Sequence, residues 1–258
     1  MTLNQDITPL FDALRQFKQK TPYSFHVPGH KNGEIFPKHG QDSFEQILQI
    51  DLTELSGLDD LHAPRDVINE AQQLAAGFFK TMHTFFLIGG STVGNLAMIL
   101  AVCEQGDKII VQRNSHKSIM NGLELANAEP VFISPEFDVD VQRYTNPSLT
   151  TLEKAIKENP DSKAVILTYP DYFGRTYPLE EMVQIAHQHE MLVLIDEAHG
   201  VHFSLGQPFP PSAIELGADL VVQSAHKMAP AMTMASFLHI HSNRMLKDNV
   251  AYYLKMLQ

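Results

Sequence analysis

Short apolar runs alternate with segments of helical hydrophobic spacing over most of this chain. The apolar runs predict strands at residues 84–88, 108–112, 130–133, 164–169, 191–196 and 219–224. Between them, apolar residues recur at intervals of three and four, as in PLEEMVQIAHQHE (178–190), and this spacing predicts helices. Alternating buried strands and helices are typical of a mostly parallel sheet with helices on both faces. We therefore predict an α/β fold.

The N-terminal part of the chain has a different pattern. Helical spacing in residues 9–20 is followed by a loop rich in proline, glycine and histidine (21–40) and by an acidic stretch, DLTELSGLDDLHAP (51–64). We expect residues 1–50 to form a helix and loop segment, and residues 51–258 to form a large domain. The last residues, NRMLKDNVAYYLKMLQ (243–258), resemble an uncapped helix, so we expect this domain to be incomplete at its C-terminal end.

Composition and charge narrow the classes of function. The 258 residues carry a net charge of -11, from 19 Lys+Arg and 30 Asp+Glu, which is unlike the basic surface of a nucleic-acid binder. We therefore expect neither nucleic acid nor a membrane as a partner. The N-terminus lacks a signal-peptide pattern, and no apolar run reaches the ~20 residues that cross a bilayer. The single cysteine, Cys103, is expected in the core, and a cytoplasmic location is predicted.

Residues suited to catalysis or anion binding follow two of the predicted strands. The segment from Gly89 to Thr92 joins a strand to a helix, where free N–H groups, hydroxyls and the helix dipole favour a phosphate. A tight glycine turn that caps the helix explains this segment equally well. Asp196 ends an apolar run, where a carboxylate is costly unless it meets a cation or several donors. An aspartate that caps the next element is the alternative.

Lys227 follows a third predicted strand, 31 positions after Asp196 (227 minus 196). A lysine at a buried strand end loses solvation unless it is neutralised, paired or covalently used. Because the carboxyl ends of parallel strands meet at one edge, these groups should lie close together. Pyridoxal phosphate (PLP) requires a lysine for a Schiff base, a carboxylate for its ring nitrogen and an anion site for its phosphate. We therefore predict PLP as the cofactor.

Six motifs in order resemble the front portion of the Orn/Lys/Arg decarboxylase major domain family, PLP-dependent enzymes of the aspartate-aminotransferase fold (fold type I). The motifs are FHVPGHKNG (25–33), DLTELSGLDDLH (51–62), GGSTVGNLAMI (89–99), RNSHKSIMNGLELANAEPVFI (113–133), LIDEAHGVHF (194–203) and GADLVVQSAHK (217–227). The resemblance implies decarboxylation of arginine, lysine or ornithine to the amine and CO2, in the context of polyamine biosynthesis. It also implies a homodimer or higher homo-oligomer, and a small C-terminal domain that this chain lacks.

The resemblance further implies a set of site residues. Lys227 would form the Schiff base, and Asp196 would face the pyridine nitrogen. The remaining cofactor-binding residues would be Gly90, Ser91, Thr92, His116, Ala198, Ser224 and His226. The phosphate would contact the Ser91 and Thr92 segment together with Ser224 and His226, and the ring would lie between His116 and Ala198. His226 and His199 are the further catalytic candidates, His199 without an assigned role.

Several alternatives stay open. Outside the family, His116 is more simply a surface histidine at a helix start. The histidine pairs have no third ligand at a recognisable spacing, so no metal site is predicted. Ala225, Asp171 and Met234 depart from the family pattern, which leaves substrate preference and turnover open. The alternative functions are another fold-type-I PLP enzyme, such as an aminotransferase or aldolase-like lyase, and a truncated inactive homologue.

The acidic stretch suggests a substrate contact. Its carboxylates, Asp51, Glu54, Asp59 and Asp60, are candidates for binding the distal cation of a basic amino acid, and a bidentate carboxylate would favour the planar guanidinium of arginine. A solvated loop whose carboxylates cap backbone N–H groups explains the stretch equally well.

Overall fold

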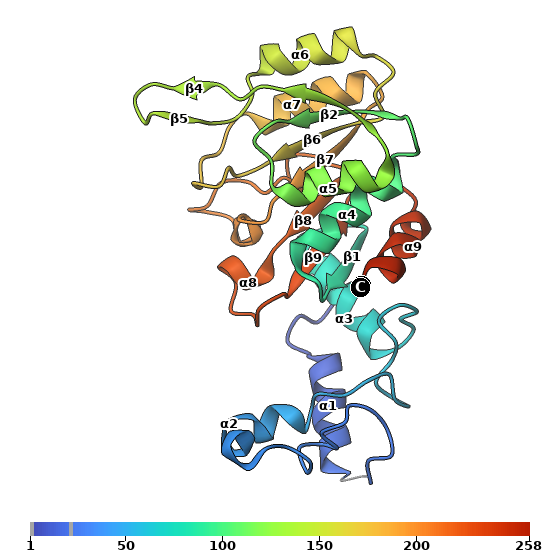
Figure 1. Cartoon of the computed structure of the whole chain (residues 1–258). Coiled ribbons are helices and arrows are strands. Elements are labelled where there is room, and N and C mark those ends of the chain that lie inside the picture. Colours follow the sequence, from blue (N-terminus) through green and yellow to red (C-terminus); the bar gives the residue numbers. More distant parts are fainter. Residues whose placement is uncertain (1–2, 21–22) are drawn as a thin grey trace. The chain divides into compact units, whose positions relative to one another are not determined.

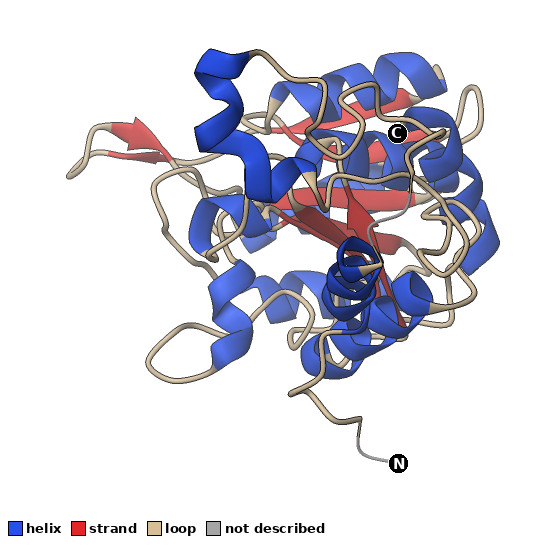
Figure 2. Ribbon diagram, turned by 90° about the horizontal axis from the view of Figure 1, so that it is seen from below, coloured by secondary structure: helices blue, strands red, loops and turns tan. Residues whose placement is uncertain are grey.

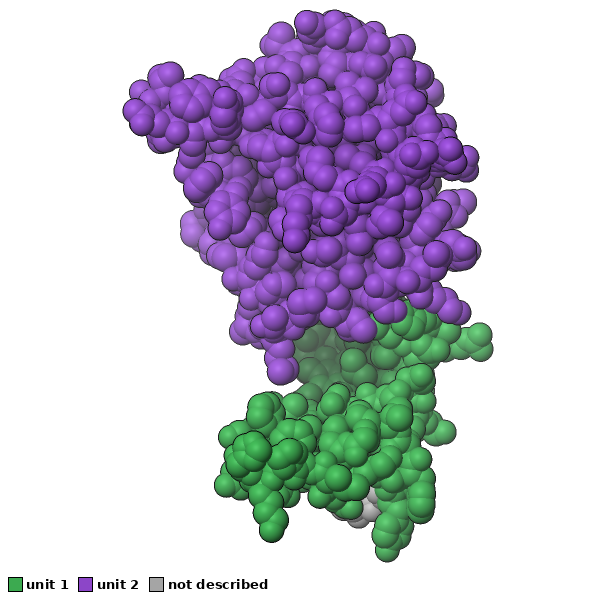
Figure 3. Space-filling view, in the orientation of Figure 1, with its two compact units in different colours: residues 1–78 green, residues 79–258 purple. Residues whose placement is uncertain are grey.

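The computed structural model describes residues 3–20 and 23–258, and the chain divides into two compact units, Met1–Phe78 and Phe79–Gln258 (Figure 3). The boundary expected between residues 50 and 51 stays a prediction. None of the helices in the described residues has the length and apolar character that spanning a membrane requires.

The first unit contains α1 (Pro9–Gln19), α2 (Lys38–Leu48) and nearly all of α3 (Val67–Phe79). Helix α1 starts with proline at its first position, where the missing N–H costs nothing, and it has Asp12 in its first turn and Lys18 in its last, as the helix dipole favours. The helix expected within residues 9–20 is thereby confirmed. Helix α2 was not predicted, and its first three residues lie in the segment 21–40 that was expected to be a loop.

The second unit is built on a seven-stranded sheet in the order β1-β9-β8-β7-β6-β2-β3 (Figure 1). Its strands are β1 (His83–Leu87), β2 (Lys108–Gln112), β3 (Glu129–Ile133), β6 (Ala164–Thr168), β7 (Leu192–Asp196), β8 (Leu220–Gln223) and β9 (Ser236–Ile240). All neighbouring pairs from β8 to β3 are parallel, and β9 is antiparallel to both of its neighbours. The predicted mostly parallel sheet is confirmed.

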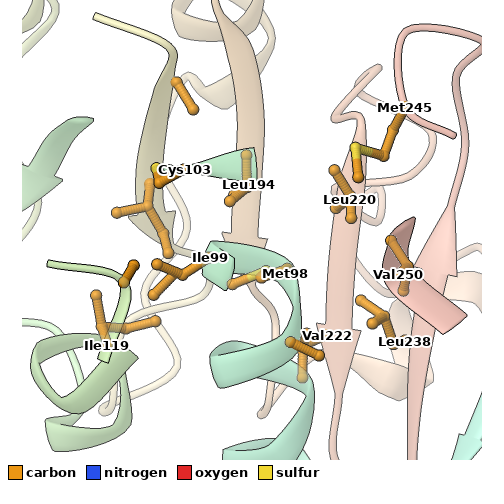
Figure 4. Close-up of a cluster of buried hydrophobic side chains, with 14 of the residues drawn as sticks. Met98, Ile99, Cys103, Ile119, Leu194, Leu220, Val222, Leu238, Met245 and Val250 are labelled. Atoms are coloured by element: carbon orange, nitrogen blue, oxygen red, sulfur yellow. The ribbon is translucent and has the colours of Figure 1, made fainter. Parts of the chain in front are cut away.

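Helices cover both faces of this sheet (Figure 2). Helices α4 (Gly90–Val102), α5 (Lys117–Ala126) and α9 (Lys247–Leu257) share one core cluster with alternate strand residues such as Leu194 and Val222 (Figure 4). Helix α6 (Leu149–Glu158) lies beside α7 (Leu179–Gln188), and α7 packs on β7. Cys103 belongs to the core cluster, as expected, and burial raises the pKa of its thiol to about 12.

The structure also contains strands that the apolar pattern did not predict. These are β9 and a two-stranded hairpin of β4 (Phe137–Asp138) and β5 (Arg143–Tyr144). Strand β9 carries a fully buried histidine, His239, whose Nδ1 and Nε2 lie 2.9 Å from Thr84 Oγ1 and 3.0 Å from Gln223 Oε1. Because both ring nitrogens have partners on neighbouring strands, a polar residue occupies a position that the pattern expects to be apolar.

Gln223 joins this histidine to a buried carboxyl group. Gln223 Nε2 donates to Glu197 Oε2 at 2.6 Å, and Glu197 also accepts from Ser212 Oγ at 2.9 Å and from the Ala213 N–H at 2.7 Å. Glu197 has no exposed surface. Loss of hydration raises the pKa of Glu197 to about 8, although its three donors each lower it. The folded chain therefore holds the proton of Glu197 to a higher pH than the unfolded chain does.

We expect the Glu197→Gln variant to lose part of the pH dependence of stability. In the native chain the pKa rises from 4.5 unfolded to about 8 folded, so folding favours the protonated form. The resulting stability is fully present below pH 4.5 and is lost as pH rises towards 8, at up to ~1.4 kcal/mol per pH unit. Urea unfolding between these pH values should show a shallower slope for Glu197→Gln. The same change at the exposed Glu124 should leave the slope as it is, and equal slopes for both variants would contradict this account.

Candidate active site

A cavity of about 590 Å³ opens where β2, β6 and β7 end, within the range of small-ligand pockets. Its lining includes the last residue of each of these strands, Gln112, Thr168 and Asp196. Six of the sequence-predicted residues line it, namely Ser91, His116, Asp196, Ala198, His199 and Lys227. The expectation that the carboxyl ends of the parallel strands bring these groups together therefore holds for these six. Gly90, Thr92, Ser224 and His226 are not among the lining residues.

Among the described residues, Asp196 is one of two buried carboxylates that line this cavity, and Asp171 is the other. Asp196 is the last residue of β7, with 3% of its surface exposed. Its Oδ1 accepts from the Ala198 N–H at 3.1 Å, and its Oδ2 accepts from Asn95 Nδ2 on α4 at 2.9 Å. Across residues 3–20 and 23–258, no lysine, arginine or histidine forms an ion pair with it. The hydrogen bond from the Ala198 N–H is what an aspartate that caps the next element would accept. Such a cap requires neither the burial of Asp196 nor a donor from the distant helix α4.

Lys227 lies beyond the sheet rather than at the end of a buried strand. Strand β8 ends at Gln223, and the short helix α8 (Ala225–Met228) carries Lys227 to the mouth of the cavity. Its side chain is exposed. The prediction that Lys227 loses its solvation is therefore wrong for this chain, because α8 places the ammonium group outside the layer of the sheet. The expected place of Lys227 at the edge that carries Asp196 agrees with the structure.

His199 is the partner of Lys227. Its Nε2 lies 3.2 Å from Lys227 Nζ, and its ring meets the edge of the Tyr172 ring at 5.6 Å. Partial burial lowers the pKa of His199, and the positive charge of Lys227 lowers it further. The ring is therefore neutral at neutral pH, and Nε2 accepts a hydrogen bond from the Lys227 ammonium group.

His116 precedes α5 and caps its first turn. Its Nδ1 accepts from the Ser118 N–H at 3.2 Å and lies 2.8 Å from Ser118 Oγ. The ring is exposed to solvent and also lines the cavity. The structure therefore combines both interpretations of His116, the histidine at a helix start and the histidine at the candidate site.

The expected phosphate segment forms the start of α4. Gly90 has φ +73°, and a Cβ on Gly89 would come within 2.3 Å of Val93 Cγ2, so both positions need glycine. The N-cap residue, Gly89, has no side chain that could bond the first N–H groups of the helix, and Ser91 reaches the cavity lining. On the other side of the site, Ser224 is fully buried, and His226 Nδ1 donates to the Ala235 carbonyl at 3.0 Å.

Sequence reasoning missed Asn95 and Ser118, which are both buried beside Asp196 and His116. The only signal for Asn95 was a polar residue inside the apolar helix GSTVGNLAMILAV.

Sequence reasoning also left Asp171 unexplained. Asp171 Oδ1 accepts from the N–H groups of Phe173 and Arg175, both at 2.9 Å, so this residue shapes the loop that places Tyr172 and Phe173 at the cavity.

In the first unit, Asp59 has a structural role that favours the capping alternative for the acidic stretch. Both of its oxygens accept backbone N–H groups, which come from Asp60 and, around the start of α3, from Arg65, Asp66, Ile68 and Asn69. Loss of hydration, the largest single effect, raises the pKa of Asp59. The hydrogen bonds together outweigh it and lower the pKa to about 2.

Comparison with known proteins places these residues in a family context. The Orn/Lys/Arg decarboxylase major domain matches residues 8–258. Uncharacterized protein YaaO of Bacillus subtilis (strain 168) is 51% identical over 252 residues, which cover 97% of this chain and 52% of that protein. Arginine decarboxylase of the same strain is 40% identical over 256 residues, with 99% and 52% covered. This chain therefore spans about half the length of these curated relatives.

Solved structures agree on the fold. Lysine decarboxylase A from Pseudomonas aeruginosa superposes with a TM-score of 0.85 at 23% identity, covering 97% of this chain and 37% of that chain. The constitutive lysine decarboxylase of E. coli gives 0.82 at 18% identity, covering 98% and 38%. At these identities the likeness shows the fold alone, which is the large-domain fold of fold-type-I enzymes.

We expect the Asp59→Ala variant to lower the stability of the chain without changing the cavity of the second unit. Loss of a capping carboxylate costs about 1 kcal/mol at neutral pH. Because the pKa is lowered from 3.8 to about 2, this contribution is present above pH 3.8 and shrinks as pH falls towards 2. Thermal unfolding at several pH values measures it, with Asp42→Ala on the exposed side of α2 as the control. Equal midpoints for the native chain and Asp59→Ala at neutral pH would contradict the capping role.

Proposed function

This chain belongs to the Orn/Lys/Arg decarboxylase family, and from that premise we propose that it is the PLP-binding portion of an enzyme that decarboxylates a basic amino acid. The observation that carries the proposal is the carboxylate of Asp196. It is buried at the base of the cavity, is held by two neutral N–H donors, and has no cationic partner among the described residues. A buried carboxylate without a cation is costly, and a protonated ring nitrogen would offset that cost.

The cavity fits PLP in its donor set and in its size. Asp196 would face the ring nitrogen, Ala198 and His116 would contact the ring, and Lys227 would bond the aldehyde carbon. Ser91 and the first N–H groups of α4 would meet the phosphate. We keep Gly90, Thr92, Ser224 and His226 as predicted phosphate contacts. When bound, PLP supplies a protonated ring that accepts the electron pair released as the bond from Cα to the carboxylate breaks.

Side chains of this protein would accept and donate the protons that the reaction moves. His199 Nε2 accepts a hydrogen bond from Lys227 Nζ across 3.2 Å, so it is placed to take the proton that Lys227 must lose to act as a nucleophile. Because its pKa is lowered, the imidazole is neutral and able to accept. Lys227 or His226 would return a proton to Cα after CO2 has left.

Arginine is the substrate that we propose to test first. The relatives of 38–40% identity that carry an enzyme name are called arginine decarboxylase, whereas a relative at 25% is called lysine decarboxylase LdcA. A cytoplasmic location and a homo-oligomeric assembly of the whole protein belong to the same proposal. The wider alternatives, an aminotransferase or lyase activity and an inactive homologue, predict different products and are separated by the experiment below.

We expect the purified chain to develop a visible absorbance band with PLP, and borohydride to fix the cofactor on the peptide that contains Lys227. Lys227→Ala should show neither the band nor the fixed adduct, because Lys227 is the one lysine among the described residues that line the cavity. Lys157→Ala, at an exposed position on α6, should behave like the native chain. An adduct on another lysine would contradict the assignment.

With arginine, lysine or ornithine, the loaded protein should release CO2 and the matching amine, and Lys227→Ala should release none. A keto acid in place of CO2 would indicate a transaminase. A stable adduct on Lys227 with neither product would indicate that this portion binds PLP without turning over substrate.

A further inference from the structure

We propose that Asn95 is a positioning residue that aims the Asp196 carboxylate at the cofactor ring nitrogen, an inference that rests on the proposed PLP site. Asn95 lies on α4 with 1% of its surface exposed, among apolar neighbours such as Val93, Ala97 and Met98. Nothing in the packing of this helix calls for a polar side chain at that position. Its role therefore has to come from the groups that it contacts.

Both amide hydrogens of Asn95 are used. Asn95 Nδ2 donates to Asp196 Oδ2 and to Ser118 Oγ, each at 2.9 Å. Because Ser118 Oγ accepts from Asn95, its own hydrogen is free for His116 Nδ1, 2.8 Å away. The Ser118 N–H donates to the same nitrogen at 3.2 Å. A continuous and directed chain of hydrogen bonds therefore joins Asp196 to His116, two groups that line the cavity.

The orientation of the Asn95 amide is determined by its partners. Turning the amide over would place Oδ1 against the Asp196 carboxylate, and two acceptors would then face each other. In the observed orientation Oδ1 is buried and has no hydrogen-bond partner within the described residues. An unpaired buried acceptor costs free energy, which an apolar residue of similar size would avoid. The amide is therefore retained for its two donors.

A neutral donor suits Asp196 better than the alternatives. A lysine or arginine at this position would neutralise the carboxylate and remove its attraction for a protonated ring nitrogen. An apolar residue would leave Asp196 with only the Ala198 N–H and free to rotate. The amide orients the carboxylate while leaving its charge available. At the other end of this chain of hydrogen bonds, the Ser118 N–H and hydroxyl both meet His116 Nδ1 and orient the ring.

The test compares PLP with its deaza analogue, in which a C–H group replaces the ring nitrogen. Dissociation constants for both compounds are measured by absorbance titration for the native chain, Asn95→Leu and the control Ile99→Ala. Ile99 is fully buried on the same helix, and its apolar side chain cannot form a hydrogen bond with Asp196, so its variant reports the general effect of damage to α4. Thermal unfolding of each variant shows how far stability has changed.

We expect Asn95→Leu to weaken PLP binding about tenfold, equivalent to ~1.4 kcal/mol, and to leave binding of the deaza analogue unchanged. Ile99→Ala should change both constants by the same factor. If Asn95→Leu does not fold, Ser118→Ala provides the test. It removes one of the two hydrogen bonds that hold the amide, so it should give a smaller selective loss, about threefold.

An equal loss of affinity for both compounds in Asn95→Leu, or no loss for PLP, would overturn the positioning role. For Ser118→Ala, an unchanged ratio of the dissociation constants for PLP and the deaza analogue would also overturn the positioning role. A different result, measured on the native chain alone, would contradict the proposed function. A native chain that does not prefer PLP to the deaza analogue would show that Asp196 does not serve the ring nitrogen, whatever the Asn95 variant does.

Discussion

The candidate site depends on one unfavourable arrangement, the buried carboxylate of Asp196, which forms no ion pair with any lysine, arginine or histidine that the structure describes. Asp196 lies at the base of the cavity with only two N–H donors, one from the backbone of Ala198 and one from the amide of Asn95. Such a group destabilises the fold unless a ligand brings a positive charge. The same arrangement would account for the proposed affinity for a protonated heterocycle and for a neutral side chain at Asn95.

The sheet topology places the other groups around that carboxylate. Parallel strands β2, β6 and β7 end at the same edge, so the loops that follow them carry His116, Tyr172 and His199 to one cavity. Strand β8 contributes Lys227 through α8, which keeps the amine at the mouth of the cavity and within reach of His199. The fold therefore determines where these side chains lie, and the burial of Asp196 determines the chemical property that we propose for the site.

Much of this arrangement could be predicted from the sequence, because apolar runs reveal buried strands and a charged residue directly after such a run marks a strand end. That logic found Asp196 and the edge on which Lys227 lies. It failed for β9, since a buried histidine with two partners resembles a surface residue in a sequence pattern. It also missed Asn95, whose partners lie 23 and 101 positions away in the chain. Hydrogen bonds between distant segments leave no local periodicity.

The most direct test of the central claim is the protonation state of the cofactor ring nitrogen in the complex with this chain. PLP labelled with ¹⁵N at that position, bound to the native chain, reports it through the ¹⁵N chemical shift. This account predicts a protonated nitrogen in the native chain at neutral and mildly basic pH, and an unprotonated one in Asp196→Asn. An unprotonated nitrogen in the native chain, or equal shifts in the two proteins, would contradict the claim that Asp196 exists to hold that proton.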